Sequence, residues 1–280
     1  MSIAPRQRSS KSLVRSDPCL REIRFSSPPD VSTRPWPARP SGEATYGCQG
    51  SQPRTFPGRR SWGLPRGKHI LLRTDAGLTL HTHFTMDGTW HLYQPGEKWR
   101  GPGFQVRAVI ETTDVVAVGF RLGICELIRT ADETQRLRHL GPDVLGGDWD
   151  RNEAIRRLGT HPEREAGTML IDQRVMAGPG NIYKSEVCFL ERLNPWTALG
   201  DVADPTRLVD RMKELMEANR EAGRQITTGD SRPGHERWVA GRWRLACRRC
   251  GSQIRKADQA SYDFERVTYW CPTCQPASPA

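Results

Sequence analysis

The segment Gly178–Glu186, with the sequence GPGNIYKSE, decides the fold of this chain. It follows an apolar stretch, AGTMLIDQRVMAG, whose pattern is helical. Gly178 and Gly180 can adopt backbone angles that other residues avoid, and such glycines suit a tight turn. The pattern therefore predicts a helix, a glycine turn and a second helix over 182–191.

The start of that second helix is suited to binding an anion. The first amides of a helix have no intrahelical partner and lie at the positive end of the helix dipole. A phosphate oxygen is a natural acceptor there, and Asn181 could cap the helix or reach a phosphate or a sugar. The alternative is an ordinary helix–turn–helix corner whose glycines allow close packing, and the segment alone does not separate the two interpretations.

The charge of the chain indicates a polyanionic partner. Its 280 residues carry a formal net charge of +10, with a pI near 9.5. Such an excess suits nucleic acid or an acidic membrane surface, although a solvated basic surface would give the same composition. The sequence has no apolar run near the ~18–20 residues of a membrane span and no apolar signal segment after its basic start. We therefore expect a cytoplasmic protein, in which disulfides are rare, with no membrane partner.

Four regions follow one another along the chain. Residues 1–65 are rich in Pro, Ser and Arg without periodicity, which predicts disorder. Residues 66–128 hold short apolar runs, with a hairpin around Asp75–Gly77, and form a β-rich domain. Residues 129–236 are helical, and residues 237–280 are rich in Arg, Trp and Cys but too short for an apolar core of their own. The expected helices are 131–139, 151–158, 162–177, 181–192 and 205–222.

The last region contains a metal-binding pattern. Two CxxC pairs are separated by twenty residues, and their cysteines are Cys247, Cys250, Cys271 and Cys274. This spacing lies at the upper edge of that of four-thiolate zinc sites, and a β-hairpin between the pairs would bring them together. Four thiolates fill a zinc tetrahedron and leave no position for water, so the metal would be structural. A redox CxxC is the alternative, but two copies without a βαβ pattern do not favour it.

The cysteine-rich region is also basic. Its Arg and Lys side chains lie within the first CxxC pair and along the expected hairpin, namely Arg248, Arg249, Arg255, Lys256 and Arg266. A basic zinc hairpin suits insertion along a nucleic-acid groove. Alternatively, these side chains only solvate a small domain.

The glycine turn, the cysteine pattern and the β-rich region occur here with specific sequences. The helix–turn–helix segment reads DQRVMAGPGNIYKSEVCFL, and the cysteine region contains ITTGDSRPGHERWVAGR, CRRCG and ERVTYWCPTCQ. The β-rich region opens with RGKHILLRTDAGLTLHTHFTMDGTWHLY, and HLGPDVLGGDWD leads into the helical region. In combination these sequences resemble the formamidopyrimidine-DNA glycosylase/endonuclease VIII family, nearest to its actinobacterial endonuclease VIII 2 branch, over roughly residues 66–275.

The resemblance implies an α+β fold and a DNA-repair activity. The fold would consist of an N-terminal antiparallel β-sandwich-like domain, incomplete here, a helical helix–two-turn–helix domain and a C-terminal β-hairpin zinc finger. Members of the family flip a damaged nucleotide out of the duplex, remove oxidised bases and nick the strand by β- and δ-elimination. Their nucleophile is the N-terminal proline exposed after Met removal. It forms a Schiff base with the sugar C1′, and a glutamate directly after it handles protons.

The resemblance also implies roles for individual residues. Lys68 in RGKH matches the lysine that contacts DNA phosphates and assists elimination. Arg266 matches the finger arginine that grips phosphates at the lesion and assists δ-elimination. Asn181, with Gly180 beside it, matches the phosphate-binding turn of the helix–two-turn–helix motif.

Two further residues match positions that face the duplex. Met86 in FTMDG lies where the family fills the hole left by the flipped base. Arg121 in GFRLG loosely matches a residue that faces the DNA. Without the resemblance, Lys68 and Arg266 would be interpreted as generic surface charge and Met86 as ordinary core packing.

The start of the chain departs from the family. The family begins Met-Pro-Glu-Gly-Asp, whereas this chain begins Met-Ser-Ile-Ala-Pro and contains no PEGD sequence. Three explanations are open: residues 1–65 are read in a shifted frame, the protein binds damaged DNA without cutting it, or another amine replaces the proline. That amine would be the α-amine of Ser2 after Met removal, with a reference pKa of about 7.7–8.0, or Lys68 if desolvation lowered its pKa.

The leading hypothesis is a zinc-containing DNA glycosylase of base-excision repair with AP-lyase activity. We expect a monomer that acts on double-stranded DNA with damaged or abasic sites and associates with the bacterial nucleoid. The alternative is a damaged-DNA-binding protein without catalysis, because the Pro-Glu pair is missing. A zinc-ribbon transcription or RNA-binding factor would explain the cysteines and the charge, but not RGKH and GPGNIYKSE in the same chain.

Overall fold

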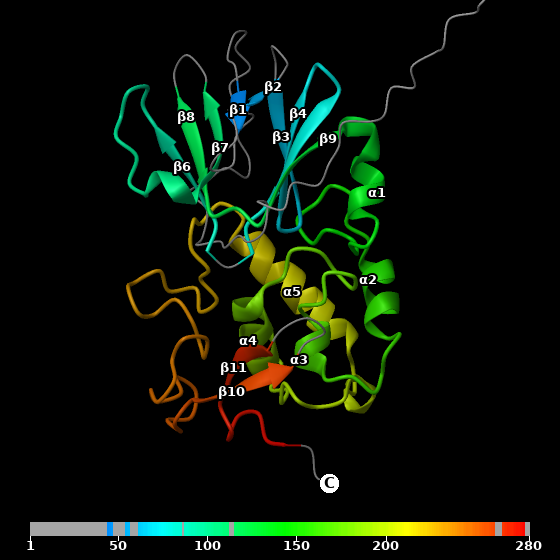
Figure 1. Cartoon of the computed structure of the whole chain (residues 1–280). Helices are drawn as coiled ribbons and strands as arrows, with labels where there is room; N and C mark the ends of the chain where they lie inside the picture. The colour runs from blue at the N-terminus through cyan, green and yellow to red at the C-terminus, as the bar shows by residue number, and fades with distance from the viewer. Residues whose placement is uncertain are drawn as a thin grey trace, which may run out of the picture.

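The chain folds into two lobes, an upper one of strands and a lower one of helices (Figure 1). The computed structural model describes residues 44–46, 54–56, 61–85, 87–111, 115–260 and 265–277. The upper lobe holds two sheets, and the lower lobe holds the longer helices together with a C-terminal hairpin.

Within the described residues, nine strands build the upper lobe. They are β1 (Ala44–Tyr46), β2 (Arg54–Phe56), β3 (Ser61–Arg66), β4 (His69–Thr74), β5 (Leu78–His83), β6 (Thr89–Tyr93), β7 (Val106–Glu111), β8 (Val116–Phe120) and β9 (Ile124–Arg129). A 3-10 turn, η1 (Gly103–Gln105), precedes β7. One sheet has the order β3-β4-β5-β9 and the other β2-β1-β7-β8-β6, and all neighbouring pairs are antiparallel. The sheets share an apolar core that includes Leu80, Phe84, Ile110 and Leu122, which confirms the expected antiparallel sandwich.

Regular structure begins earlier in the chain than the sequence indicated. β1, β2 and all of β3 except Arg66 lie within residues 1–65, where disorder was expected, so that expectation is wrong for these strands. β3 lies at the edge of its sheet, and an edge strand tolerates a residue such as Pro65 without losing a ladder bond. Pairing with β4 along its whole length overrides the poor strand propensity of the segment. The four domain boundaries stay predictions.

The hairpin expected around Asp75–Gly77 is confirmed. β4 and β5 flank this turn, in which Gly77 has a φ of +72° and donates its N–H to the Thr74 carbonyl at 3.2 Å. A positive φ favours glycine, because a Cβ would crowd the backbone there.

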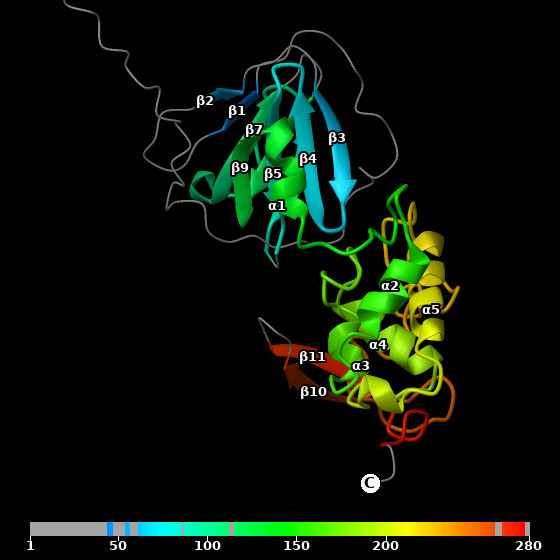
Figure 2. The same ribbon diagram turned by 90° about the vertical axis from the view of Figure 1, so that its right-hand side faces the viewer.

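A short helix covers the outer face of the β3-β4-β5-β9 sheet (Figure 2). It comprises the 3-10 turn η2 (Thr130–Asp132) and α1 (Glu133–Leu137), where a helix over 131–139 was expected. The buried Glu133 carboxylate anchors it to the sheet by accepting hydrogen bonds from Arg73 and Thr79.

The lower lobe is an assembly of short helices around α4 and α5. Its elements are α2 (Arg151–Leu158), α3 (Ala166–Met169), α4 (Asn181–Leu190), η3 (Leu199–Asp201) and α5 (Thr206–Ala218). The helix expected over 151–158 is confirmed, and those over 181–192 and 205–222 end earlier. Their shared core includes Met169, Val187, Leu208 and Met212. No helix in the described part of the chain has the length and apolarity that a bilayer crossing requires.

The helix expected over 162–177 is wrong for most of its length. Only α3 forms there, because the Asp172 side chain accepts the Arg174 N–H at 2.9 Å and competes with helical hydrogen bonding. The chain then pairs with the linker: Ala177 donates its N–H to the Pro142 carbonyl at 2.9 Å, and Val144 donates its N–H to the Ala177 carbonyl at 3.1 Å.

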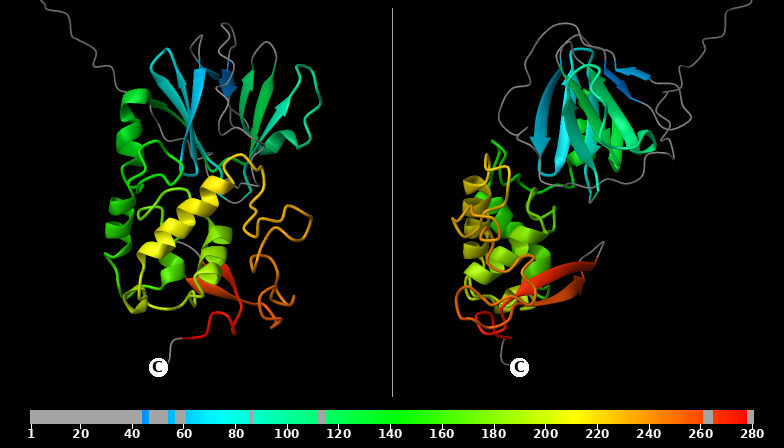
Figure 3. Two further views of the ribbon diagram at one scale, coloured as in Figure 1. Left: turned by 180° about the vertical axis from the view of Figure 1, so that it is seen from behind. Right: turned by 90° about the vertical axis from the view of Figure 1, so that its left-hand side faces the viewer.

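The hairpin of the cysteine region packs on α4. It consists of β10 (Arg255–Ala260) and β11 (Glu265–Trp270), which are antiparallel, and β11 contacts α4 (Figure 3). Phe189 of α4 stacks on Trp238 with ring centroids 5.5 Å apart, and Val239 and Ile254 complete this small apolar cluster.

The two lobes meet at the β3–β4 turn. Gly67 has a φ of +58° and donates its N–H to Oδ2 of the buried Asp143 at 2.6 Å. A Cβ added at Gly67 would lie 2.9 Å from Cβ of Ala177 and 3.2 Å from N of Gly178. The turn therefore fits directly against the backbone that leads into α4.

Gly67→Ala should destabilise the protein and loosen this contact. Gly77→Ala is the matched control, because Gly77 also has a positive φ but a Cβ there would meet nothing within 4 Å. The backbone strain alone should cost about 1–2 kcal/mol in each variant, and the clash with Ala177 should make Gly67→Ala clearly worse. Thermal unfolding of both variants checks this, and equal losses would contradict the contact.

Candidate nucleic-acid interface

Lys68 lies in the β3–β4 turn, where the upper lobe meets the lower one. Its side chain packs against the start of α4, because a Cβ added at Gly180 would lie 3.9 Å from Cε and 4.0 Å from Nζ of Lys68. Burial, and secondarily the Arg266 guanidinium, lowers the pKa of Lys68 to about 8. At pH 7 about one tenth of such amines are deprotonated, on the order of 10²-fold more than in a free lysine.

Asn181 joins the start of α4 to β11. Its Nδ2 donates a hydrogen bond to the Val267 carbonyl at 2.6 Å. Its Oδ1 is buried and has no hydrogen-bond partner among the described residues. An unsatisfied buried acceptor costs about 1–3 kcal/mol, and such groups are uncommon in folded proteins. This oxygen can accept a hydrogen bond from a ligand or from water.

The start of α4 presents unpaired backbone donors. The helix begins at Asn181 with Gly180 as its N-cap, and no side chain caps it, so the expectation that Asn181 is the cap is wrong by one residue. The Lys184 N–H reaches the Gly180 carbonyl at 3.1 Å, and the three preceding amides have no intrahelical partner. Gly178 has the positive φ that the turn required, +112°, whereas Gly180 is extended at −123°. Gly180 therefore contributes close packing with Lys68, and its backbone angle is open to any residue.

Arg266 lies near the start of α4, because its neighbour Val267 is bonded to Asn181. The hydrogen bond from Asn181 to Val267 brings this part of β11 to the start of α4. The Arg266 charge lowers the pKa of both Lys68 and Lys184, so it lies near both. Three sequence motifs that are far apart in the chain, RGKH, GPGN and ERVTYW, therefore meet at one point.

Lys184 forms a buried polar contact that the sequence did not indicate. Its Nζ donates to Oγ1 of Thr268 at 2.6 Å, and its side chain is fully buried. Thr268 in turn donates to Oε1 of Gln259 at 3.0 Å, and Gln259 donates to Oε2 of Glu165 at 2.7 Å. Burial lowers the pKa of Lys184 to about 8. This network fixes both strands of the hairpin on the lower lobe.

Glu186 is the second buried charge of α4. Its carboxylate accepts backbone N–H groups from Trp238, Val239 and Ala240, each at 2.8 Å, and the Thr227 hydroxyl. These contacts hold the segment that leads to the first cysteine pair. A buried carboxylate needs several donors, and these backbone N–H groups supply them.

Histidines gather behind Lys68. Nδ1 of His69 lies 2.8 Å from Nε2 of His81, and Nδ1 of His81 lies 3.0 Å from Oε1 of Glu126. The Glu126 carboxylate accepts, so Nδ1 of His81 donates to it. Burial first, then neighbouring charged groups, lowers the pKa of His69 to about 2 and that of His83 to about 4. Both rings are neutral at physiological pH.

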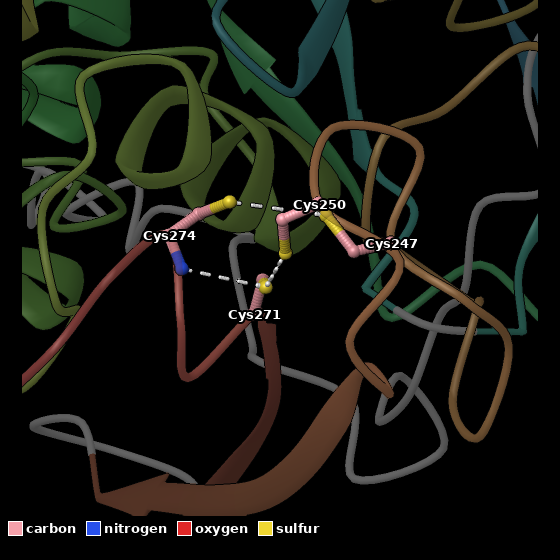
Figure 4. A group of neighbouring side chains, drawn as sticks. All are labelled: Cys247, Cys250, Cys271 and Cys274. Carbon is pink, nitrogen blue, oxygen red and sulfur yellow. Dashed lines mark hydrogen bonds between the residues drawn. The ribbon is translucent and has the colours of Figure 1, made fainter.

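The four cysteines form a group that could hold a metal ion (Figure 4). Their sulfur atoms all lie within 4.8 Å of one another. Sγ of Cys247 is 4.0 Å from Sγ of Cys274, and Sγ of Cys250 is 3.4 Å from Sγ of Cys271. Thiolates at about 2.3 Å from a tetrahedral ion are about 3.8 Å apart, so the spacing fits. β10 and β11 form the expected hairpin between the pairs.

Two further predicted residues are Met86 and Arg121. Met86 lies outside the described residues. Arg121 follows β8 with a φ of +47°, donates its N–H to the Gln105 carbonyl at 2.7 Å and has an exposed side chain. Among the described residues no contact joins Arg121 to Lys68 or Asn181, and its DNA contact stays a prediction.

The chain combines a β-sandwich, a lobe with a helix–turn–helix segment and a hairpin with four clustered cysteines. Lys68, Asn181 and Arg266 lie where these three parts meet. This combination defines the helix–two-turn–helix class of folds. No family model matches the chain. The chain is 48% identical over 219 residues to a probable endonuclease 8 2 of Streptomyces coelicolor, covering 77% of this chain and 78% of that protein. It is 41% identical over 215 residues to the DNA-(apurinic or apyrimidinic site) lyase Nei2 of Mycolicibacterium smegmatis, covering 77% and 82%.

A solved structure shares the fold. The Lactococcus lactis formamidopyrimidine-DNA glycosylase, non-covalently bound to DNA that contains an AP site, superimposes with a TM-score of 0.65 at 23% identity, covering 77% of this chain and 81% of that chain. Together with the sequence relatives, this places the chain: it belongs to the formamidopyrimidine-DNA glycosylase/endonuclease VIII family.

Glu186→Gln should destabilise the lower lobe. The amide NH₂ that replaces one carboxylate oxygen would face backbone N–H donors, and the loss should exceed about 2 kcal/mol. Glu217→Gln is the control, because Glu217 makes only exposed ion pairs on α5 and should change stability by less than about 0.5 kcal/mol. Chemical unfolding measures both, and a Glu186→Gln variant as stable as the control would refute the role of the buried carboxylate.

Proposed function

We propose that the chain binds double-stranded DNA at damaged or abasic sites and acts in base-excision repair as a DNA glycosylase with AP-lyase activity. The observation that carries the proposal is the hydrogen bond from Asn181 to Val267, with Lys68 packed on Gly180 beside it. It gathers an amine, helix amides and a finger arginine within reach of one stretch of DNA backbone. Family membership supports the same activity.

The chemistry of this surface suits phosphate groups. The amides at the start of α4 lie at the positive end of the helix dipole, and phosphate oxygens are natural acceptors there. Lys68 and Arg266 add positive charge next to these amides. Arg266 presents a planar guanidinium that can bind a phosphate with two hydrogen bonds. The overall charge of +10 strengthens the attraction at long range.

The metal of the cysteine group is a structural zinc ion in this proposal. Four thiolates are the soft ligand set that zinc prefers, and they leave no open position for substrate or water. The ion would be held by Cys247, Cys250, Cys271 and Cys274, and its contribution is to hold the hairpin that carries Arg266. The protein would work as a monomer, and binding DNA would associate it with the nucleoid.

The second candidate function is binding of damaged DNA without catalysis. The observation that favours it is that the sequence contains no Pro-Glu-Gly-Asp segment, which carries the nucleophile of the family. The two candidates share the same binding surface. They differ only in whether an amine of this chain reacts with the sugar.

Arg266→Ala should weaken binding of an abasic-site duplex about tenfold, which corresponds to about 1.4 kcal/mol. Removing one phosphate contact should also lower the slope of log K against log salt by about one. Arg156→Ala is the control, because Arg156 lies on α2 in an exposed ion pair with Glu153. Fluorescence anisotropy at several salt concentrations measures both. An unchanged salt slope for Arg266→Ala would show that β11 does not contact the backbone.

Cys271→Ser should remove the metal and weaken DNA binding. The purified chain should contain about one zinc ion per molecule, since four thiolates complete a single site. Cys188→Ala is the control, because Cys188 is a buried thiol of α4 outside the cysteine group and its loss should leave the zinc content unchanged. Elemental analysis and DNA titration give both readouts. Full affinity without zinc would exclude the finger from the interface.

A further inference from the structure

We propose that the base of the β10–β11 hairpin is a docking surface for an acidic segment of a partner protein. This surface, the finger-base patch, consists of Trp243, Arg244, Leu245 and Lys256. It combines exposed apolar side chains with cations that have no carboxylate partner among the described residues. The patch shares no residue with the phosphate-binding surface, so this role goes beyond the proposed function.

Two apolar side chains of the patch are exposed to solvent. Trp243 is 43% exposed and Leu245 is 54% exposed, and both lie in the short segment before the first cysteine pair. The other large apolar side chains that the structure describes as exposed belong to the upper lobe. Exposed apolar groups that lie together mark binding surfaces, so the base of the hairpin is the place in the described lower lobe where a partner would cover them.

The Trp243 ring is held by the two cations of the patch. Cζ of Arg244 and Nζ of Lys256 each lie 4.2 Å from the centroid of the ring. Cation–π contacts of this kind orient the indole. Both charged side chains are exposed, so their N–H groups remain accessible to an anion. A carboxylate that pairs with them would therefore lie next to the indole.

The backbone of the patch is fixed by pairing with the start of β10. Arg244 donates its N–H to the Ile254 carbonyl at 3.0 Å, and Ile254 donates its N–H to the Leu245 carbonyl at 2.9 Å. Arg244 has a φ of +65°, in the left-handed region that favours glycine. Strained residues persist where the surrounding structure holds them, and they cluster at functional positions. The turn thus keeps an arginine where a glycine would be free of strain.

The charge of this segment is unbalanced. Residues 237–256 contain seven Arg and Lys residues and no Asp or Glu. Three of the arginines donate to backbone carbonyl groups and so hold the segment together. Arg244 and Lys256 make no ion pair with a described residue, although Asp258 is exposed two positions further along β10. Each arginine of α2 and α5, by comparison, is paired with a carboxylate. A partner that supplies carboxylates would complement the charge of the patch.

The segment that carries the patch packs on the end of α4 opposite the phosphate-binding amides. Arg249, within the first cysteine pair, donates to the Phe189 carbonyl in the last turn of the helix, and its Cζ lies 4.2 Å from the centroid of the Phe189 ring. At 1.5 Å per residue, Phe189 is about 12 Å along the helix from Asn181. The patch therefore belongs to the far end of α4.

The hairpin separates the patch from Arg266 in the same way. Lys256 is opposite Tyr269 on the ladder, and Arg266 is opposite Gln259. Three ladder positions thus lie between Lys256 and Arg266, or about 10 Å along the strands. Figures 2 and 3 show the segment before β10 on the side of the lower lobe opposite the free end of the hairpin. DNA bound at the start of α4 would leave the patch accessible.

The combination of charge and apolar surface favours a protein partner over nucleic acid. A phosphate backbone could pair with Arg244 and Lys256, but it offers no apolar surface to cover Trp243 and Leu245. A peptide segment with Asp or Glu beside Phe or Leu offers both. Arginine-containing surfaces recognise acidic motifs in this way, and Trp and Arg supply much of the binding energy at protein interfaces.

Peptide binding tests the proposal. The probe is a fluorescein-labelled peptide, Asp-Asp-Phe-Asp-Asp-Leu-Asp-Asp, titrated with the full-length chain and followed by fluorescence anisotropy. Trp243→Ala and Lys256→Glu should each weaken its binding at least about fivefold, because one removes the apolar contact and the other reverses a charge. A peptide with Asn for every Asp, and one with Ala for Phe and Leu, should each bind at least about fivefold more weakly to the wild type.

Leu92→Ala and Lys98→Glu are the matched controls. Both residues are exposed and lie in the upper lobe, so these variants should bind the peptide like the wild type. Trp243 and Lys256 lie outside the buried clusters, so their variants should unfold at the wild-type temperature. Affinity for an abasic-site duplex is measured in parallel. Trp243→Ala should leave it unchanged, and Lys256→Glu should lower it no more than Lys98→Glu does.

Four results would overturn the proposal. The first is a wild-type chain that does not bind the peptide at about 1 mM, and the second is equal affinity of the wild type and Trp243→Ala for it. The third is a loss of duplex affinity confined to the two patch variants, which would assign the patch to DNA. The fourth is self-association of the wild type that Trp243→Ala abolishes, seen by size-exclusion chromatography, which would assign the patch to a second copy of the chain.

Discussion

The hydrogen bonds between α4 and β11 are the interaction on which the rest of the interface depends. Three consecutive strand residues bond to one turn of the helix: Val267 to Asn181, Thr268 to Lys184, and the Tyr269 N–H to Oγ of Ser185 at 3.3 Å. A hairpin this small has little apolar core of its own, so its place on the lower lobe is set by these polar contacts and by the cluster around Phe189. The same contacts determine where Arg266 lies.

Two side chains of α4 are buried charges, and each holds a different segment on the helix. Burying Lys184 and Glu186 costs desolvation, and an apolar pair of the same volume could be as stable. Each charge has instead several directional partners: Glu186 accepts four donors, and Lys184 begins a chain through Thr268 and Gln259. We interpret Lys184 as fixing the register of β11 on α4, because a one-residue slip of the strand would move Thr268 away from it. Glu186 fixes the segment 238–240 on the same helix.

The sequence predicted the features that local chemistry determines. The cysteine spacing, the hairpin at Gly77 and the helix over 151–158 each follow from a local pattern, and all three are present. The predictions failed where tertiary contacts outweigh local preference. β3 forms in a proline-containing segment because β4 pairs with it, and the helix expected over 162–177 gives way because Ala177 pairs with the linker.

The sequence predicted individual residues of the candidate site, but not the contacts that hold them in place. The sequence placed Lys68, Asn181 and Arg266 near DNA through family resemblance, and the structure brings all three together. It could not show that Glu186, Lys184 and the histidines behind Lys68 support them. The contacts of Glu186 and Lys184, and that of His81 with Glu126, join residues more than forty positions apart, and no local pattern encodes them.

Asp143 joins the two lobes of this architecture through one carboxylate. Its carboxylate accepts the Gly67 N–H through Oδ2 and the Leu145 N–H through Oδ1, so a single side chain bridges the strand lobe and the linker. It therefore fixes the β3–β4 turn, and with it the backbone of Lys68, against the segment that leads into α4, so a single carboxylate sets the distance between the Lys68 amine and Gly180.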